Sequence, residues 1–392
     1  MWPLKLIVSS RSKIKVKILH NISDVSCADW NALLPPRGSP GYHPFTDWDF
    51  LGALEVSGCV GDGTGWQAAH LWLEDNSAKL RGCAPLYVKS HSMGEYVFDQ
   101  GWADAAARAG MDYYPKLQCA IPFTPVTGPR LIANNPEAET TLISALKDIC
   151  NQNKMSGVHL TFGEKSLVAR LSEQGFLIRT DRQFHFINRD YTDFDDFLSN
   201  LTSRKRKKIK AERRKAQEQV TIKRLCGDDI KPEHWDAFYK FYLDTSARKW
   251  GRPYLTRAFF KVVHETMREQ VLLVLAYEGD TPIAGALNFI GDDALYGRHW
   301  GGIMDVPFLH FELCYYQAIE AAIDMKLSRV EAGAQGDHKL ARGYEPVQTY
   351  SAHYLTHPGL QDAVANFLKQ ERRAVAQHIN VLGEHTPFKR DT

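Results

Sequence analysis

The sequence lacks the long apolar run that a membrane-spanning helix needs. No stretch approaches the roughly 18 to 20 consecutive apolar residues required, and the apolar residues near the N-terminus are interrupted by Lys5, Arg11 and Lys13. No clear cleavage site of a signal peptide follows them. We therefore expect a cytoplasmic protein without a transmembrane segment.

The sequence also lacks paired cysteines and an excess of charge of one sign. Its seven cysteines are an odd number and form no Cys-x-x-Cys pair, which argues against a disulfide framework and a zinc knuckle and for a reducing compartment. We expect no metal site. The net charge of +2 gives no global argument for nucleic acid, so any surface for an anionic partner must be local.

Length and composition indicate an ordinary globular protein of more than one domain. The chain has 392 residues, of which 44% are hydrophobic and 24% charged. A chain of this length predicts two or three domains, each able to bury a core without disulfides or metals.

The second half shows a readable order of elements. Three apolar segments separated by short polar turns, at 271–277, 282–290 and 294–302, predict an antiparallel meander. Apolar residues at helical spacing then predict a helix at 311–326, followed by strands at 329–334 and 347–355.

The first half repeats this order. Strands are predicted at 65–74, 80–88 and 117–126, a helix at 138–150 and a strand at 157–162. Gly82 and Gly285 fall at corresponding places in the second strands, which indicates duplicated domains. We expect a first domain at 20–189 and a second at 190–392, with a basic helix at 203–219 near its start and a closing helix at 361–373.

Several segments resemble the FemAB-like proteins, which are bacterial proteins described as peptidoglycan biosynthesis or recognition proteins and predicted N-acyltransferases. The resemblance spans about 27–388 and rests on HPFTDWDFLGALEVSG, APLYVKSHSMGEYVFDQGWADA, YYPKLQCAIPFTPVTGPRL, KWGRPYLTRAFF, LHFELCYYQAIEAAI and VEAGAQGDHKLARGYEP. It implies an α/β fold of two tandem GNAT-like domains, each a mixed, mainly antiparallel sheet flanked by helices. It also implies transfer of an acyl or aminoacyl group to an amine of a peptidoglycan precursor.

The densest group of candidate site residues follows the strand predicted at 329–334. Small residues and glycines there let a ligand approach the backbone, and a lysine can hold a phosphate or an oxyanion. The resemblance implies that Lys339 engages the substrate near the transfer site. Our candidate catalytic residues are Lys339, Glu331, His310 and Tyr344, and Gln335, His338 and Arg342 are candidates for substrate binding. A solvated loop is the alternative for this segment.

The start of the helix predicted at 311–326 lacks a glycine-rich loop. In GNAT enzymes such a loop cradles the pyrophosphate of acyl-CoA at a helix N-terminus, but residues 304–313 contain no glycine. We therefore expect weak binding of acetyl-CoA in the second domain. The acyl donor is either aminoacyl-tRNA, as in Fem relatives, or acyl-CoA, and we assign no cofactor residues.

Two further segments are candidates for binding a polar substrate. In the first half, a loop after a strand mixes charged and aromatic residues, and its candidates are Lys89, His91, Glu95, Tyr96 and Lys116. His91 and Glu95 would align if the segment is helical. In the second half the candidates are Trp250, Arg252 and Arg298, because a Gly-Arg-Pro turn between aromatic rings suits an anion. Packing in the core is the alternative for the aromatic residues.

A basic run extends from Arg204 to Lys215. Nine of these twelve residues are Lys or Arg, and Ile209, Ala216 and Val220 mark a narrow apolar stripe by which a helix can dock. Phosphates of tRNA, anionic lipid head groups of a membrane or a nucleotide-linked precursor would suit the run, and a solvated linker helix is the alternative. No aromatic residue interleaves the run, so base stacking is not indicated.

The sequence thus favours an N-acyltransferase or aminoacyltransferase acting on a cell-envelope precursor or another amine. Two alternatives stay open. One is a protein that recognises peptidoglycan precursors without catalysis, and the other is an RNA-binding module that acts through the basic run.

Overall fold

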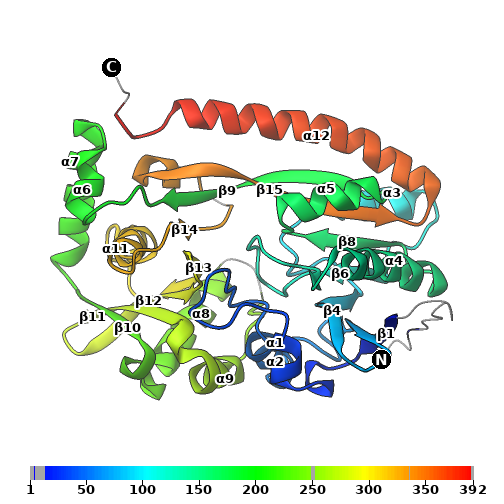
Figure 1. Ribbon diagram of the computed structural model, residues 1–392. Helices are drawn as coiled ribbons and strands as arrows, with labels where there is room; N and C mark the ends of the chain where they lie inside the picture. Colours follow the sequence, from blue (N-terminus) through cyan, green and yellow to red (C-terminus); the bar gives the residue numbers. More distant parts are fainter. Residues whose placement is uncertain (1–3, 5–13, 249–251, 335, 390–392) are drawn as a thin grey trace. The chain divides into compact units, whose positions relative to one another are not determined.

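The computed structural model describes residues 4, 14–248, 252–334 and 336–389 (Figure 1). The chain separates into two compact units. Unit 1 comprises the chain up to Pro36, Phe45–Asp181 and Thr349–Ala376, and unit 2 comprises Arg37–Pro44, Arg182–Gln348 and the chain from Gln377. These units are defined by packing and differ in their bounds from the predicted domains 20–189 and 190–392, mainly because 349–376 pack within unit 1. The division by sequence repeat stays a prediction.

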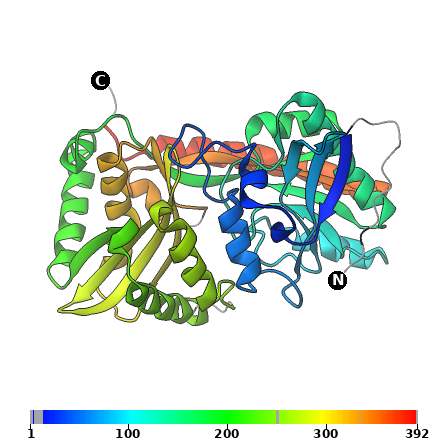
Figure 2. The same ribbon diagram turned by 60° about the horizontal axis from the view of Figure 1, so that its bottom comes forward.

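Unit 1 is built on antiparallel hairpins and one parallel strand pair. The strand β1 (Ile14–Leu19) pairs with β3 (His70–Asp75) (Figure 2), β3 with β4 (Leu80–Ala84), and β4 with β7 (Ile132–Ala133). A second run of paired strands contains β2 (Trp66–Ala68), β5 (Leu86–Lys89), β6 (Lys116–Cys119) and β8 (Gly157–Thr161). Only β6 and β8 are parallel in this unit among the described strands. The helices are α1 (Cys27–Asn31), α2 (Trp48–Val56), α3 (Gln100–Arg108), α4 (Pro136–Gln152) and α5 (Lys165–Glu173).

Unit 2 contains the predicted meander. The strands β10 (Thr221–Cys226), β11 (Val271–Glu278), β12 (Thr281–Ile290) and β13 (Ala294–Gly302) pair in this order, all antiparallel. The short strand β14 (Arg329–Glu331) then pairs parallel with β13. The helices of the unit are α6 (Phe194–Ser199), α7 (Ser203–Gln217), α8 (Pro232–Arg248), α9 (Arg257–Met267), α10 (Leu309–Phe311) and α11 (Gln317–Asp324).

Each unit completes its sheet with a strand from the other half of the sequence. The strand β9 (Leu177–Ile187) follows β8 in the chain, but its residues 185–187 pair with β14. The strand β15 (Tyr344–Leu355) follows β14, but its residues 351–355 pair with β8. Each of the two strands therefore pairs with a strand from the other half of the sequence, and not with the strand that precedes it in the chain.

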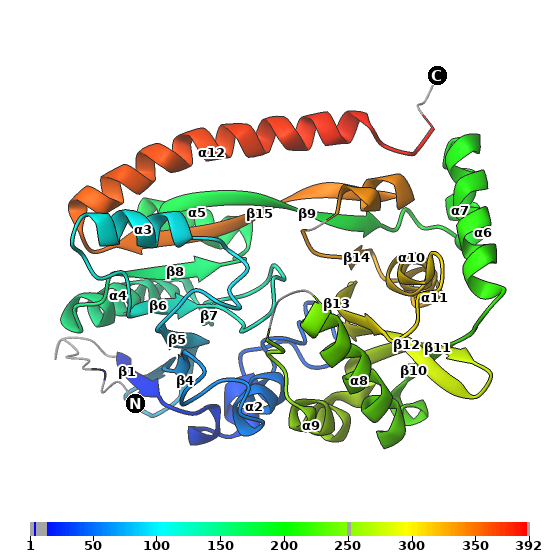
Figure 3. The same cartoon turned by 180° about the vertical axis from the view of Figure 1, so that it is seen from behind.

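Helices cover both faces of the meander in unit 2. Ala284 and Ala286 of β12 belong to the core that contains α11, whereas a Cβ on Gly285 would meet Phe238 of α8 at 3.0 Å. Because side chains alternate between the faces of a strand, α8 and α11 lie on opposite faces (Figure 3). The approach of α8 to the sheet is closer still at Gly301 of β13, where a Cβ would lie 2.1 Å from the Phe241 carbonyl oxygen.

Several predicted elements are interrupted in the structure. The strand predicted at 65–74 divides at Ala69 into β2 and β3, and that at 80–88 divides at Pro85, which has no N–H for a ladder. The strand predicted at 117–126 ends at Cys119. The helix predicted at 311–326 consists of α10, a π-helical turn at Glu312–Tyr316 and α11.

The closing helix α12 (Pro358–Glu384) is longer than predicted. Its buried residues Leu360, Val364 and Leu368 lie in the first part of the helix. This is the part in which the apolar pattern of the sequence predicts a helix. Among the described residues, no helix combines the length and the apolarity that crossing a membrane would require.

Candidate functional site

The strands β13 and β14 form a short parallel pair that ends abruptly. They pair from Ala294 with Arg329 to Tyr296 with Glu331, while β13 continues to Gly302. The register between β12 and β13 shifts at this place, between the pair Leu287 with His299 and the pair Asn288 with Gly297. Such a bulge redirects a strand. Beyond Tyr296 and Glu331 the two strands are not paired among the described residues, and we refer to this place as the slot.

Lys339 lies in the 3₁₀ turn Asp337–Arg342 that follows β14. Its side chain is buried, with 4% exposed. The Nζ atom donates hydrogen bonds to the carbonyl oxygens of Ala332, at 2.5 Å, and Gly333, at 3.1 Å. Burial lowers the pKa of Lys339 to about 8, because a charge without a nearby countercharge is costly inside a protein. No carboxylate of the described residues forms an ion pair with this ammonium group.

Glu331 lies at the end of β14, at the closed end of the slot. Its carboxylate accepts a hydrogen bond from Arg329 Nε at 2.9 Å, and His185 Nε2 of β9 lies 3.7 Å from the other oxygen. Burial lowers the pKa of His185. A Cβ on Gly297 would lie 3.4 Å from the Glu331 carbonyl oxygen, which is ordinary van der Waals contact.

Aromatic and imidazole rings gather beside Lys339. Tyr315 OH lies 3.0 Å from Nε2 of His338 and 3.4 Å from Nε2 of His310. The Trp300 ring of β13 lies 5.1 Å from that of His310, and the Phe311 ring lies 5.3 Å from that of His338. The structure thus brings three predicted residues, Lys339, His310 and His338, into one region.

Arg342, another predicted residue, is held by groups of α7 and of the π-helical turn. Its guanidinium donates to both carboxylate oxygens of Glu212, at 2.9 and 3.1 Å, and lies 3.5 Å from the centre of the Phe311 ring. Tyr316 OH donates to the same carboxylate. Because Arg342 is 5% exposed and paired, it supports the turn that carries Lys339.

The basic helix α7 is anchored by a second buried carboxylate. Glu312, which is completely buried, accepts hydrogen bonds from Arg213 and from Gln217 of α7 and from Gln317 of α11. Ile209, like Ala216, is buried as predicted. The helix therefore docks through an apolar stripe and through charged pairs at its centre.

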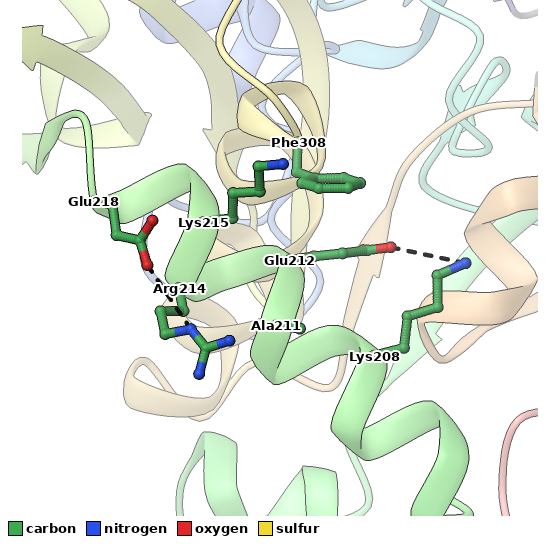
Figure 4. A pocket seen from close by; sticks show the side chains of 7 residues that line it. All are labelled: Lys208, Ala211, Glu212, Arg214, Lys215, Glu218 and Phe308. Atoms are coloured by element: carbon green, nitrogen blue, oxygen red, sulfur yellow. Dashed lines mark ion pairs between the residues drawn. The ribbon is translucent and has the colours of Figure 1, made fainter.

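The opposite side of α7 presents basic groups to solvent. Arg204, Lys207 and Lys215 are exposed and form no ion pair with any carboxylate of the described residues. A hollow of about 350 Å³ is lined by residues of α7 and by Phe308 (Figure 4): Lys208, Ala211, Glu212, Arg214, Lys215, Glu218 and Phe308. Lys215 Nζ lies 6.0 Å from the centre of the Phe308 ring. The tertiary structure thus places an aromatic ring beside a run in which the sequence shows none.

The predicted residues of unit 1 form a buried network of charges. Lys116 Nζ donates to Ser92 Oγ and Glu95 Oε2, both at 2.8 Å, and to Asp99 Oδ2 at 2.5 Å. Lys89 Nζ lies 3.5 Å from the centre of the Trp66 ring. Burial lowers the pKa of Lys89 to about 6 and raises that of Glu95 to about 7.

These network side chains have little access to solvent. Lys89 and Lys116 are 0% exposed and Glu95 is 4% exposed, so their predicted role in binding a substrate stays a prediction. The loop that carries Glu95 is not helical, so the condition under which His91 and Glu95 would align on a helix is not met. His91 Nε2 lies 3.0 Å from the Thr64 carbonyl, and Tyr96 is 38% exposed.

The remaining predicted residues lie in different surroundings. Tyr344 is completely buried, and its hydroxyl donates to the Tyr315 carbonyl at 3.4 Å. Arg298 is half-buried on β13, and Arg252 is exposed. Trp250 and Gln335 lie outside the described residues.

Three residues of unit 2 escaped the sequence analysis as candidate site residues: Glu212, Cys314 and Tyr315. A signal for Glu212 was present, because Ile209, Glu212 and Ala216 follow helical spacing and place this carboxylate on the buried stripe of α7. For Cys314 and Tyr315 the spacing was noted only as an apolar helix face. The π-helical turn, which changes that spacing, has no signal in the sequence. Among the described residues, no group of His, Cys, Asp and Glu has the geometry of a metal site.

Comparisons with known proteins agree with the resemblance seen in the sequence. The model of the FemAB-like family, described by peptidoglycan biosynthesis/recognition, matches residues 21–390. A search of curated proteins found no significant match.

Solved structures of similar fold share little sequence with this chain. FemX is 13% identical with a TM-score of 0.52, covering 87% of this chain and 98% of its own. The C-terminal domain of a putative lysylphosphatidylglycerol synthetase from Agrobacterium fabrum is 7% identical with a TM-score of 0.52, covering 88% and 95%. A tandem GNAT protein of the clavulanic acid pathway is 10% identical with a TM-score of 0.45, covering 88% and 99%. The likeness to FemX, together with the element order of each half, confirms the predicted fold of two GNAT-like domains.

Proposed function

Since this chain belongs to the FemAB-like family of peptidoglycan biosynthesis/recognition proteins, we propose that it is an N-acyltransferase of the Fem type. It transfers an acyl or aminoacyl group from an activated donor to an amine of a peptidoglycan precursor. The reaction takes place in unit 2, and the protein acts in the cytoplasm.

The buried ammonium group of Lys339 is the observation that carries this proposal. It lies just beyond the slot between β13 and β14, it is held only by carbonyl oxygens, and its charge has no carboxylate partner among the described residues. An oxyanion or a phosphate would supply the missing negative charge. Acyl transfer through a tetrahedral intermediate generates such an oxyanion.

The slot supplies the other parts that the reaction needs. Beyond Tyr296, β13 has no partner on β14 among the described residues, and in this proposal its backbone groups there orient an acyl carbonyl. We assign Glu331, at the end of β14, and His310, beside Trp300 of β13, as acceptors of the proton that the attacking amine loses. Each would act only when the substrate lies within hydrogen-bond reach.

Exposed basic groups on α7 support aminoacyl-tRNA as the donor. Arg204, Lys207 and Lys215 carry charges that no described carboxylate neutralises, and such groups bind the phosphates of a nucleic acid. Phe308, 37% exposed beside Lys215, adds a ring on which a base can stack. Acyl-CoA is the alternative donor, but the loop before α10 lacks the glycines that cradle a pyrophosphate.

Replacing Lys339 by alanine tests the proposal. We expect transfer of labelled amino acids from charged total tRNA to nucleotide-linked or lipid-linked muropeptide precursors to fall by about a hundred- to a thousandfold, the usual effect of losing one oxyanion donor. Circular dichroism would show whether the variant is folded. Lys261→Ala is the matched control, because Lys261 lies in the same unit with a side chain that is 71% exposed.

Two results would contradict the proposal in different ways. A Lys339→Ala protein with unchanged turnover would remove Lys339 from the reaction. A parent protein that binds precursors but transfers nothing from either donor class would instead favour recognition without catalysis.

A further inference from the structure

Four side chains beside Lys339 form a continuous chain of hydrogen-bonding groups. Cys314 Sγ lies 3.4 Å from Nδ1 of His310. Nε2 of the same imidazole lies 3.4 Å from Tyr315 OH, which in turn lies 3.0 Å from Nε2 of His338. The chain therefore leads from a half-buried thiol to an exposed imidazole.

The chemistry of these groups allows a proton to move along the whole chain. Each imidazole carries a donor on one nitrogen and an acceptor on the other, and a phenol both donates and accepts. If the thiol donates to Nδ1 of His310, then Nε2 of His310 donates to Tyr315 and Tyr315 donates to His338. A shift of every proton by one bond leaves a thiolate at Cys314 and a protonated imidazole at His338.

The thiol lies in a distorted part of its helix. Cys314 lies within the π-helical turn Glu312–Tyr316, and such turns occur frequently at functional sites because they change the direction of side chains within a helix. The negative charge of a Cys314 thiolate acts on Lys339 and opposes the effect of burial on its pKa. Conversely, the ammonium charge of Lys339 favours the thiolate form of Cys314.

We propose that Cys314 is a nucleophile that carries the acyl group as a thioester between donor and acceptor. This inference rests on the proposed function, but it replaces direct transfer by transfer in two steps. His310 is the base that takes the thiol proton. Tyr315 and His338 are positioning residues that fix the tautomer of His310.

Both steps are balanced without any additional reactant. In the first, Sγ attacks the carbonyl carbon of an activated acyl donor, the C–S bond forms, the bond to the carrier oxygen or sulfur breaks, and the carrier leaves with the proton taken by His310. In the second, the amine attacks the thioester, the C–N bond forms and the C–S bond breaks. The proton lost by the amine returns through His310 to Sγ.

Acylation of the full-length protein by p-nitrophenyl acetate tests the thiol directly. We expect a burst of about one p-nitrophenolate per chain and an acetyl group on Cys314 by peptide mass spectrometry. The burst should disappear in Cys314→Ala and persist in Cys226→Ala, the control for another half-buried thiol. Because general base catalysis contributes about a hundredfold or more, His310→Ala should slow the burst by about this factor. Acetylation of Cys226 as fast as Cys314, or a burst that is unchanged in His310→Ala, would overturn the proposal.

Two natural carriers identify the donor in the same assay. Acetyl-CoA and an aminoacyl ester of adenosine are incubated separately with the protein, and acylation of Cys314 by one of them supports the proposal and names the carrier. Acylation by neither overturns it. Measuring turnover then separates the thioester intermediate from the proposed acyltransferase function. If Cys314→Ala still transfers the acyl group while Lys339→Ala does not, the thioester is refuted and the proposed function stands. If the parent protein transfers nothing, the proposed function itself fails.

Discussion

Replacement of Lys339 by methionine should make the protein more stable while it abolishes activity. The folded structure lowers the pKa of Lys339 from its usual 10.5 to about 8, so the folded state disfavours the charged form. At pH 7 this corresponds to about 3 kcal/mol of destabilisation. Methionine keeps the long aliphatic chain but removes the charge.

The gain is reduced by hydrogen bonds that methionine cannot make. The Ala332 carbonyl loses the bond from Nζ, whereas the Gly333 carbonyl keeps the bond from the Phe184 N–H at 3.1 Å. One buried carbonyl without a donor costs about 1–2 kcal/mol. We therefore expect a net stabilisation of about 1–2 kcal/mol at pH 7.

The pH dependence has a defined sign. The unfolded chain holds the Lys339 proton more tightly than the folded protein, so the destabilisation is fully present below about pH 8 and fades as the pH rises toward the unfolded value. The advantage of Lys339→Met should accordingly shrink between pH 7 and pH 9.5. Urea titrations with hydrogen exchange measured on peptides of unit 2 report the free energy of unfolding of this unit, and Lys261→Met, at an exposed site, should stay within about 0.5 kcal/mol of the parent. A Lys339→Met protein that is less stable than the parent at pH 7, or equally stabilised at both pH values, would refute the reasoning.

Three other predictions concern the rest of the chain. Calorimetry should detect no micromolar binding of acetyl-CoA, because residues 304–313 offer no glycine cradle; micromolar affinity with pyrophosphate contacts in unit 2 would contradict this. Replacing Arg204, Lys207 and Lys215 by glutamine should leave the melting temperature unchanged or slightly raised, since like charges repel along a helix. It should weaken tRNA binding and lower the slope of log affinity against log salt concentration by about 0.7–0.9 per lost phosphate contact. Unchanged affinity would show that α7 binds no phosphates. Lys116→Met should destabilise unit 1 by about 3–5 kcal/mol in urea unfolding, because it leaves two buried carboxylates without their partner. Lys89→Met should cost much less stability, because burial already lowers the pKa of the Lys89 ammonium to about 6. Equal losses of stability would refute this difference between the two lysines.

Much of the fold follows from local patterns in the sequence. The meander of unit 2 and the helix docked by Ile209 and Ala216 were predicted, because apolar periodicity decides which face of a strand or helix is buried. Lys339 was recognised after a strand end rich in small residues. In each case the deciding interactions lie within a few residues of one another in the chain.

The tertiary structure alone decided the exchange of β9 and β15 between the units. The strand β9 pairs with β14, and β15 with β8, strands that lie far from them in the sequence, so the local pattern predicts a strand but not its partner. The same holds for the buried charges. Glu212 meets Arg342 across 130 positions of the sequence, and Lys116 meets Glu95 across 21. A basic or acidic residue alone indicates a solvated surface. A partner of opposite charge that folding brings near lowers the free-energy cost of burying it.

The candidate site divides in the same way. The sequence alone identified Lys339, His310 and His338 as polar residues near the ends of two elements. Only the π-helical turn, a backbone feature without a residue signature, placed Cys314 and Tyr315 in line with these groups. The physical reason is that a hydrogen bond is lost when the distance between donor and acceptor grows by a few tenths of an ångström. Distances of this precision are set by the packing of the whole unit rather than by spacing along the chain.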